Sequence, residues 1–271
     1  MLKMRLTDFD PGKIASSGQC FRMKEIAYGT HEVIAGSRYL RIGRGCTDGS
    51  FIFSCSQKEM DSFWKNYFDF DTDYGEIRRS VDPSDHYLKG AVQAGSGIRI
   101  LRQDLFETII SFIITQQNNI PRIRGIIERL CMKYGRYIPE EKNRPAYFAF
   151  PEAGALAEAG IQDLEEIGLG YRAKYIRKSA QQIEGGEIVL DEIASLGYDE
   201  AKKRLLGLYG VGTKVAECIC LFARHDADAF PVDVHIRRML AEHYPDGFPF
   251  SRYRGYAGIL QQYIFYRELE A

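Results

Sequence analysis

The feature that most constrains the fold is a change of hydrophobic periodicity near Gln57. Before this point, four segments alternate apolar and polar residues and are separated by turn sequences such as YGT, GSR and TDG. Alternation with a period of two is typical of strands that bury one face of a sheet. We therefore expect antiparallel strands at residues 20–26, 30–36, 39–44 and 50–55.

After Gln57 the apolar residues recur at intervals of three and four, which is the spacing of one helix face. We expect helices at residues 58–70, 85–95, 105–117, 120–135, 161–168, 171–186, 199–210, 232–245 and 251–269. The predicted class is α+β. Residues 1–97 would form a β-rich lobe with flanking helices. Residues 98–271 would form a helical region, with room for two helical subdomains.

Composition excludes several classes of protein. The apolar fraction of 45% and the charged fraction of 27% are ordinary for a globular chain. No apolar run reaches the roughly 20 residues of a membrane span, and the start of the sequence lacks the apolar core of a signal peptide. We therefore expect an intracellular protein, in the cytoplasm or nucleoid, with no membrane partner. The six cysteines lack paired metal-ligand spacing, so we expect reduced thiols and no metal site.

The net charge of −1 argues against a uniformly basic nucleic-acid binder, but it conceals local clusters. One cluster follows the amide-rich turn at residues 116–119, and another covers residues 172–178. A charged run is commonly only the solvated face of a helix, so charge alone leaves both interpretations open.

The stretch LLGLYGVGTKVAECICLFARH, residues 205–225, raises the sharpest question, because Lys214 opens an apolar segment. A phosphate-binding P-loop is rejected, since Thr and Lys stand in reversed order and LLGLYG looks helical. A plain helical hairpin whose lysine reaches water is one alternative. The other is a helix-hairpin-helix at residues 207–214. In that motif Gly210 and Gly212 make a tight turn, and the amides of the second helix face a DNA phosphate.

Further motifs decide between these alternatives. Pro231-Val-Asp233-Val-His235 follows one helix later, and four other stretches have a related pattern: SGQCFR from residue 17, QNNIPR from 117, GLGYRAK from 168, and Tyr256-Ala-Gly258…Gln261…Phe265. Together they resemble the 8-oxoguanine DNA glycosylase branch of the helix-hairpin-helix (HhH-GPD) superfamily. The resemblance implies a TBP-like N-terminal antiparallel sheet followed by a larger all-helical region. It also implies a bifunctional glycosylase/AP lyase that excises 8-oxoguanine opposite cytosine from duplex DNA in base excision repair.

The resemblance makes Lys214 and Asp233 the catalytic pair. A free lysine amine has a pKa of about 10.4, and packing against apolar groups favours its neutral, nucleophilic form. Attack on the sugar C1′ expels the base and leaves a Schiff base. The acidified C2′ then permits elimination of the 3′ phosphate. Asp233 would stabilise the positive charge that develops on the sugar, and we also expect it to cap the helix that follows.

The base pocket is implied in the same way. The carbonyl of Gly18 would accept the N7 proton that 8-oxoguanine has and guanine lacks, and Gln261 would read the base-pairing edge. Cys218 and Phe265 would enclose the ring of the extruded base. One buried hydrogen bond is worth about 1–3 kcal/mol, so the energetics of extrusion must contribute to discrimination.

The resemblance also implies residues that hold the DNA. Tyr171 would be the wedge at the gap, and Arg122 and Arg172 would donate to the unpaired cytosine. His235 would contact a backbone phosphate. Gln117 stands where the family usually places an asparagine that fills the gap, and its side chain is one methylene longer.

No cofactor is required for this chemistry, although a monovalent cation at the hairpin carbonyls is compatible with such a turn. The expected partner is double-stranded DNA that contains oxidised guanine, with no obligate protein partner. Two rivals are an alkylated-base glycosylase, which normally lacks the lysine, and a non-catalytic module that uses the hairpin only to hold DNA. Iron–sulfur relatives need a C-terminal cysteine cluster, and this chain has no cysteine after Cys220.

Overall fold

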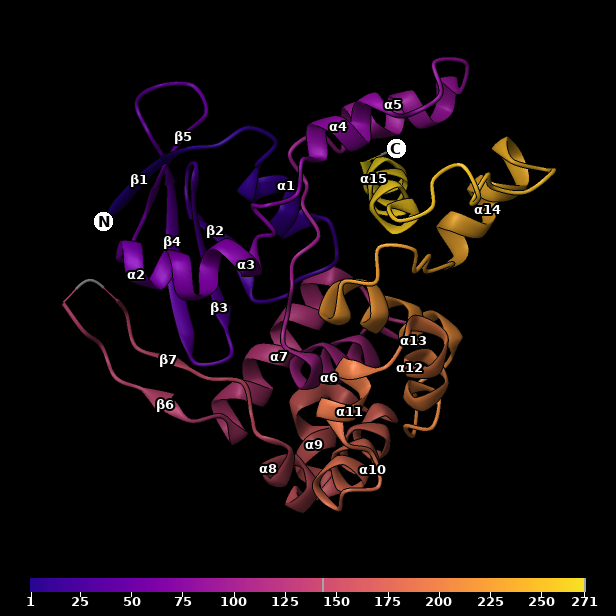
Figure 1. Cartoon of the computed structure of the whole chain (residues 1–271). Helices are drawn as coiled ribbons and strands as arrows, with labels where there is room; N and C mark the ends of the chain where they lie inside the picture. The colour runs from indigo at the N-terminus through magenta and orange to yellow at the C-terminus, as the bar shows by residue number, and fades with distance from the viewer. Residues whose placement is uncertain (143, 271) are drawn as a thin grey trace. The chain divides into compact units, whose positions relative to one another are not determined.

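The computed structural model describes residues 1–142 and 144–270 (Figure 1). The chain forms two compact units. Unit 1 comprises Met1–Glu32, Leu40–Arg102 and His225–Ala271, and unit 2 comprises Val33–Tyr39 and Gln103–Arg224. The spatial grouping therefore joins the C-terminal segment to the N-terminal lobe. The predicted domain boundary along the sequence, between residues 97 and 98, stays a prediction.

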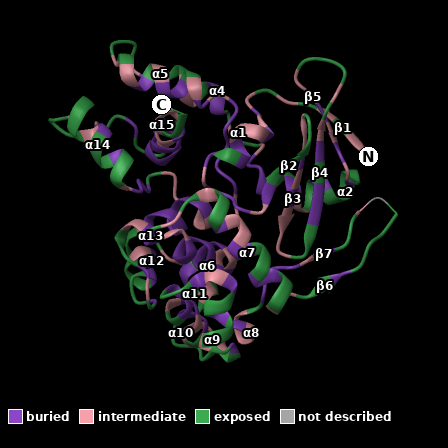
Figure 2. Cartoon of the chain, turned by 180° about the vertical axis from the view of Figure 1, so that it is seen from behind, coloured by how far each residue is buried: buried purple, intermediate pink, exposed green. Residues whose placement is uncertain are grey.

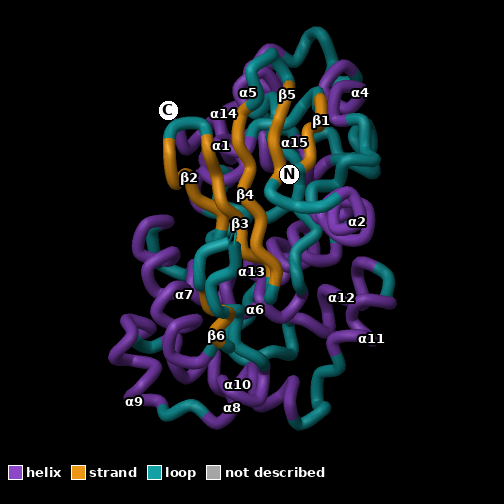
Figure 3. The backbone as a smooth tube through the Cα atoms, turned by 90° about the vertical axis from the view of Figure 1, so that its left-hand side faces the viewer, coloured by secondary structure: helices purple, strands orange, loops and turns teal. Residues whose placement is uncertain are grey.

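The N-terminal sheet has five strands in the order β1-β5-β4-β3-β2 (Figure 3). The strands are β1 (Leu2–Arg5), β2 (Met23–Ala27), β3 (Thr30–Ala35), β4 (Arg38–Arg44) and β5 (Ser50–Phe53). β1 and β4 both pair antiparallel with β5, and Leu2 lies opposite Phe53. The antiparallel sheet and the larger helical region confirm the predicted α+β class. β1 was not predicted, because four residues at an edge carry too little periodicity.

Aromatic side chains cover the buried face of this sheet within unit 1. The ring of Phe9 lies edge-on to Phe51 at 5.1 Å and to Phe68 at 5.4 Å between ring centroids. Phe68 follows a continuous helical run made of α2 (Gln57–Glu59), a π-helical stretch (Met60–Trp64) and α3 (Lys65–Tyr67). Ser56 begins that run with a capping box, which explains why the helical period starts where it does.

The other helices of unit 1 are α1 (Pro11–Ser16), α4 (Tyr74–Arg79), α5 (His86–Ala94), α14 (Val234–His243) and α15 (Ala257–Glu270). α15 packs along α5 and also contacts α14 (Figure 1). Gly95, just after α5, permits this approach. A Cβ there would lie 2.4 Å from the ring of Tyr263 on α15.

A buried carboxylate joins two of the places where the chain leaves or re-enters unit 1, at Arg102 and His225. Asp69 accepts hydrogen bonds from the guanidinium of Arg102, with an Nη2–O distance of 2.9 Å, and lies 3.0 Å from Nε2 of His225. Burial alone would raise the pKa of Asp69, but the hydrogen bonds from His225 and Arg102 hold it well below its usual value.

Unit 2 is built around α6 (Leu105–Thr115), whose middle residues are buried on every side (Figure 2). The helices that pack against α6 are α7 (Ile120–Tyr134), α10 (Arg172–Glu184), α11 (Leu190–Ser195) and α13 (Thr213–Ile219). The remaining elements are α8 (Ala153–Glu158), α9 (Ile161–Leu164), α12 (Tyr198–Leu205) and two π-helical stretches, Glu165–Leu169 and Cys220–Arg224. Asn119 caps α7, and Pro121 stands in its first turn.

A two-stranded ribbon, β6 (Tyr137–Ile138) and β7 (Tyr147–Phe148), lies in a region expected to be a loop. Each strand is too short for a periodic signal. Tyr147 anchors the ribbon, since its hydroxyl donates to the carbonyl of Ser37 at 2.7 Å and its ring lies 5.7 Å from that of Tyr39. In the described part of the chain, no helix is long and apolar enough to cross a membrane.

Candidate active site

The segment with Lys214 folds as two helices joined by a tight turn. α12 ends at Leu205 and α13 begins at Thr213. Gly210 has φ +87°, and a Cβ at this position would lie 2.5 Å from the ring of Tyr175, so both the conformation and the packing require glycine. Gly212 is the N-cap of α13 and supplies no side-chain acceptor to the first amides of the helix.

Lys214 lies in the first turn of α13 and is partly buried. Its ammonium is 5.5 Å from the ring centroid of Phe112 on α6, and Phe112 stacks on Phe222 at 5.4 Å. None of the ion pairs found across the described residues involves Lys214. The amine therefore lies over an aromatic wall and is not neutralised by a carboxylate, which suits a side chain that must act as a nucleophile.

Glu217, one turn after Lys214, was not singled out from the sequence. It is buried, accepts a hydrogen bond from the hydroxyl of Tyr198 at 2.7 Å, and pairs with Lys202. Both partners lie on α12, so this carboxylate holds the two helices of the hairpin together. The available signal was an acidic residue inside an apolar run, which needs a partner when buried.

A second arrangement in unit 2 gathers the predicted DNA contacts around Gln116, which follows α6. The side chain of Gln116 donates to the carbonyl of Gly210 at 2.9 Å. The carbonyl of Gln116 accepts from Nε of Arg172 at 2.8 Å and from the hydroxyl of Tyr171 at 3.4 Å. One residue therefore connects the hairpin, the predicted wedge and the turn that holds Gln117. Sequence reasoning missed it, because three of its five hydrogen bonds are made by its backbone carbonyl.

The structure gives Arg172 a different environment from the one expected of an outward-facing donor. It is 4% exposed, and its guanidinium also donates to the carbonyls of Gln117 at 3.0 Å and Leu169 at 3.3 Å. Here it braces the turn at Gln117, and its donation to cytosine stays a prediction. By contrast, Gln117 and Arg122 are exposed, and Tyr171 is 45% exposed.

In unit 1, α15 brings the remaining site residues together. Nε2 of Gln261 donates to the carbonyl of Pro231 at 2.9 Å, and Nε2 of Gln262 donates to the carbonyl of Ser17 at 2.6 Å. The loop before Asp233 and the turn at Gly18 are thus both held to the same helix. Gly18 has φ +74°, a conformation that glycine adopts without strain.

Two of the predicted base-pocket residues, Gln261 and Phe265, lie on α15, and another, Cys218, lies in unit 2. Gln261 is 3% exposed, and its Oε1 has no hydrogen-bond partner within the described residues. Phe265 lies one turn further along α15 and is partly buried. In unit 2, Cys218 is 2% exposed on α13. A buried amide oxygen without a donor is costly, so it is suited to receive one from a bound molecule.

Asp233 is the N-cap of α14, and its Oδ1 accepts from the backbone N–H of Ile236 at 2.9 Å. The predicted cap is confirmed. His235 is exposed in the first turn of α14, beside Val234, which is 72% exposed. The carboxylate is therefore fixed in orientation by its own helix, a requirement for a group that stabilises charge at a set position.

Two family descriptions match consecutive parts of the chain. Residues 1–109 match the N-terminal domain of 8-oxoguanine DNA glycosylase, and residues 110–246 match the HhH-GPD superfamily of base excision DNA repair proteins. The chain belongs to the HhH-GPD superfamily. The helix-hairpin-helix interpretation of residues 207–214 is thereby favoured over a plain hairpin.

Relatives agree with this membership. The chain is 34% identical over 201 residues to the N-glycosylase/DNA lyase of Saccharomyces cerevisiae, a match that covers 70% of this chain and 53% of the yeast protein. The chain thus spans about half the length of that relative. The crystal structure of the Clostridium acetobutylicum 8-oxoguanine glycosylase/lyase, in complex with DNA containing cytosine opposite 8-oxoG, has 34% identity and a TM-score of 0.90. The match covers 98% of this chain and 93% of that one.

The fold alone does not separate the branches of the superfamily. The 3-methyladenine DNA glycosylase of Archaeoglobus fulgidus is 19% identical, and its match has a TM-score of 0.77 over 99% of this chain and 98% of that chain. An alkylated-base glycosylase can therefore share the whole architecture, including the N-terminal sheet. Side chains such as Lys214 must make the distinction.

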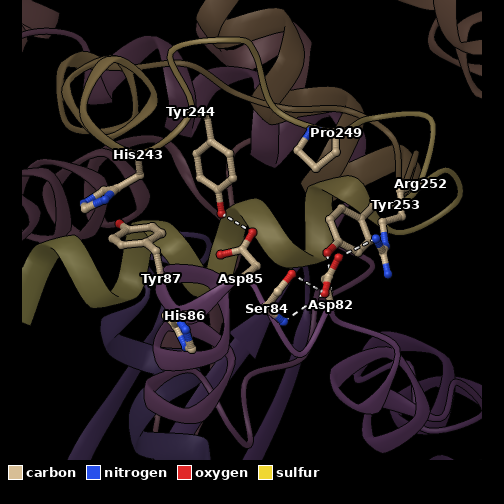
Figure 4. Close-up of a pocket in the computed structure, with 10 residues that line it drawn as sticks. All are labelled: Asp82, Ser84, Asp85, His86, Tyr87, His243, Tyr244, Pro249, Arg252 and Tyr253. Carbon is tan, nitrogen blue, oxygen red and sulfur yellow. Dashed lines mark hydrogen bonds and ion pairs between the residues drawn. The ribbon is translucent and has the colours of Figure 1, made fainter.

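Unit 1 also contains a cavity of about 450 Å³ that is separate from the predicted site residues (Figure 4). Its carboxylates already have internal partners. Asp85 accepts from the backbone of Leu88 and the hydroxyl of Tyr244, both at 2.8 Å, and Asp82 pairs with Arg252. None of the predicted catalytic or base-pocket residues lines it. This cavity is a polar junction between α5 and the end of α14.

Metal-binding groups were also sought in the part of the chain that the structure describes. No cluster of three or more His, Cys, Asp or Glu side chains there is arranged to hold a metal ion. The six cysteines are free thiols, and five of them are buried.

Proposed function

We propose that the protein is a bifunctional DNA glycosylase/AP lyase that excises 8-oxoguanine opposite cytosine from duplex DNA in base excision repair. The observation that carries the proposal is Lys214, which lies at the start of α13 with its amine over the ring of Phe112. A superfamily member that only bound DNA, or only hydrolysed the glycosidic bond, would not need an amine at this position.

The chemistry assigns a role to each group. The neutral amine of Lys214 attacks C1′ of the damaged nucleotide, and the bond from C1′ to the base nitrogen breaks, so that the base leaves with the electron pair. Loss of a proton from nitrogen and opening of the sugar give a Schiff base. Removal of a C2′ proton then expels the 3′ phosphate. Asp233, oriented by its N-cap bond, stabilises the positive charge on the sugar.

Gln261 supports recognition of the guanine edge. Its Nε2 is held by the carbonyl of Pro231, which leaves Oε1 as the acceptor proposed for the base. The base-pairing edge of 8-oxoguanine offers N–H donors to such an acceptor. The carbonyl of Gly18 is the proposed acceptor for the N7 proton of 8-oxoguanine. Cys218 and Phe265 are proposed to enclose the ring of the extruded base.

The proposed binding partner is duplex DNA alone, with no obligate protein partner. The proposed location is the cytoplasm or nucleoid, where chromosomal DNA lies. The chemistry needs no cofactor. The hairpin carbonyls of Tyr209 and Gly210 already accept hydrogen bonds from Ser179 and Gln116. A monovalent cation at the hairpin would therefore share these two carbonyl oxygens with their hydrogen-bond donors. It would support only the binding of the DNA backbone.

Borohydride trapping tests the nucleophile. The wild-type protein should form a covalent adduct with a duplex that contains 8-oxoguanine and should cleave the strand, because the Schiff base is reducible. Lys214→Gln should lose both while still binding the duplex. Lys203→Gln, an exposed lysine on the neighbouring helix α12, is the matched control and should behave as wild type.

Strand cleavage by Lys214→Gln at the wild-type rate would disprove the assignment of the nucleophile. Binding without any excision by the wild-type protein would favour a DNA-holding module. Excision of 3-methyladenine in place of 8-oxoguanine would favour the alkylated-base rival. Duplexes with each of the four bases opposite the lesion, tested on wild type and Gln117→Asn, show whether the longer amide alters the preference for cytosine.

A further inference from the structure

The first half of the hairpin is docked on α10 by Tyr209, a residue with no assigned role. Its backbone N–H donates to Oε1 of Gln182 at 2.9 Å, and its carbonyl accepts from Oγ of Ser179 at 2.8 Å. Its ring is nonetheless 44% exposed. The backbone is fixed at both polar groups, so the aromatic ring is held at the surface beside the turn.

Three tyrosine rings connect the predicted wedge to this position within unit 2. Tyr171 and Tyr175 meet edge-on with centroids 5.6 Å apart, and Tyr175 and Tyr209 meet in the same way at 5.5 Å. Tyr175 also packs against Gly210, as its contact with a hypothetical Cβ shows. This row of rings thus connects Tyr171 at the start of α10 to Tyr209 in the hairpin.

Lys178 lies at the hairpin end of this row. Its ammonium is 4.4 Å from the ring centroid of Tyr209, which orients an otherwise flexible side chain. Lys178 is exposed, and so is Lys174, one turn earlier on α10. None of the ion pairs found in the described part of the chain involves either lysine. The oriented ammonium therefore keeps its charge available for an anion.

We propose that Lys178, oriented by Tyr209, binds a phosphate of the DNA backbone beside the hairpin, outside the lesion site. The ligand is a phosphodiester group, which the lysine contacts without reading sequence. The inference rests on the proposed function, because it needs the hairpin to lie on DNA. It adds a DNA contact that depends on Tyr209 in the hairpin turn and on Lys178. Lys178 lies two turns along α10 from Tyr171, the predicted wedge.

Salt dependence of binding isolates such a contact. Each phosphate contact contributes about 0.9 to the slope of log K against log salt concentration for duplex DNA. The probe is a duplex with a tetrahydrofuran abasic analogue opposite cytosine, titrated from 50 to 200 mM KCl. Lys178→Gln should lower the slope by about one and weaken binding about three- to tenfold. The loss should be similar on an undamaged duplex.

Four further variants make the test specific. Lys178→Arg should keep the slope, because the charge remains. Tyr209→Phe should keep wild-type affinity, since the ring is retained, whereas Tyr209→Leu should lose part of it. Lys142→Gln removes an exposed lysine between β6 and β7, on the other side of unit 2 from the hairpin, and should leave the slope unchanged (Figure 1).

An unchanged slope and affinity in Lys178→Gln would overturn the proposal, as would an equal loss in Lys142→Gln. The proposed function fails in a different way, through a wild-type protein that gives no trapped adduct with 8-oxoguanine DNA. Single-turnover excision gives a second measurement. Loss of the backbone contact in Lys178→Gln should raise the protein concentration needed for the half-maximal rate.

Discussion

In the proposed function, Gln261 is a single side chain prepared for a ligand. One end of the amide is bound to the carbonyl of Pro231, and the other end has no protein partner within the described residues. The hydrogen bond at Nε2 fixes which atom of the amide is left without a partner. A buried acceptor left in this way costs about 1–3 kcal/mol, which a bound base with suitable donors would recover.

We expect Gln261→Leu to lower kcat/KM for 8-oxoguanine excision by about 10- to 100-fold, because one or two hydrogen bonds to the base are lost at about 1.4 kcal/mol per tenfold. Single-turnover kinetics over a range of subsaturating protein concentrations measure the effect. The thermal unfolding temperature serves as the control for folding. Unchanged excision by a folded variant would show that this amide does not read the base.

At the scale of elements, the two helices of the hairpin depend on one carboxylate. Glu217 on α13 binds Tyr198 and Lys202 on α12, and these partly buried contacts join the two helices of the hairpin that carries Lys214. Burial, together with the bond to Glu217, raises the pKa of Tyr198 well above its usual value. The pair of helices is therefore fixed by charge as well as by apolar packing.

Glu217→Gln should lower the free energy of unfolding by about 1–3 kcal/mol, because the charge-assisted bonds are lost and Lys202 is left without its partner. Urea denaturation measures the change. Glu200→Gln, an exposed acid on α12, is the control and should change stability by less than about 0.5 kcal/mol. An equal effect of both variants would argue against a specific clamp.

At the scale of the whole molecule, the chain passes between the units next to Arg102 and next to His225, and Asp69 binds both residues. Just beyond these points, the backbone N–H of Gln103 donates to the carbonyl of Phe222 at 3.1 Å within unit 2. The two connecting segments are thus tied to each other within unit 1 and again within unit 2.

Asp69 makes stability depend on pH in a known direction. Its pKa is lowered in the folded state, so its contribution is present above the unfolded value of about 3.9 and is lost as pH falls below it. Asp69→Asn should therefore be less stable at pH 7 and should have a flatter decline between about pH 5 and pH 2. Unfolding temperatures across this range measure it. Parallel curves for the two proteins would contradict the assignment.

Periodicity predicted most of the elements, because strands such as β3 and β5 and helices such as α7 and α10 bury one face over several repeats. It failed for β1, β6 and β7, which are too short to repeat. The motifs identified Lys214, Asp233 and the hairpin glycines, whose roles depend on local backbone geometry. Gln116, Glu217 and Gln262 were not predicted, because their partners are distant in sequence or are backbone carbonyls, and no local pattern marks either.

The two adjacent glutamines on α15 limit how this helix can change. Successive residues of a helix point about 100° apart, so one amide reaches Ser17 while the next reaches Pro231. A single-residue insertion between Gly258 and Gln261 would rotate both amides away from their carbonyls at once. Point substitutions elsewhere on α15 leave this phase intact. A change in the length of α15 would alter this phase. It would separate the turn at Gly18 from the loop before Asp233.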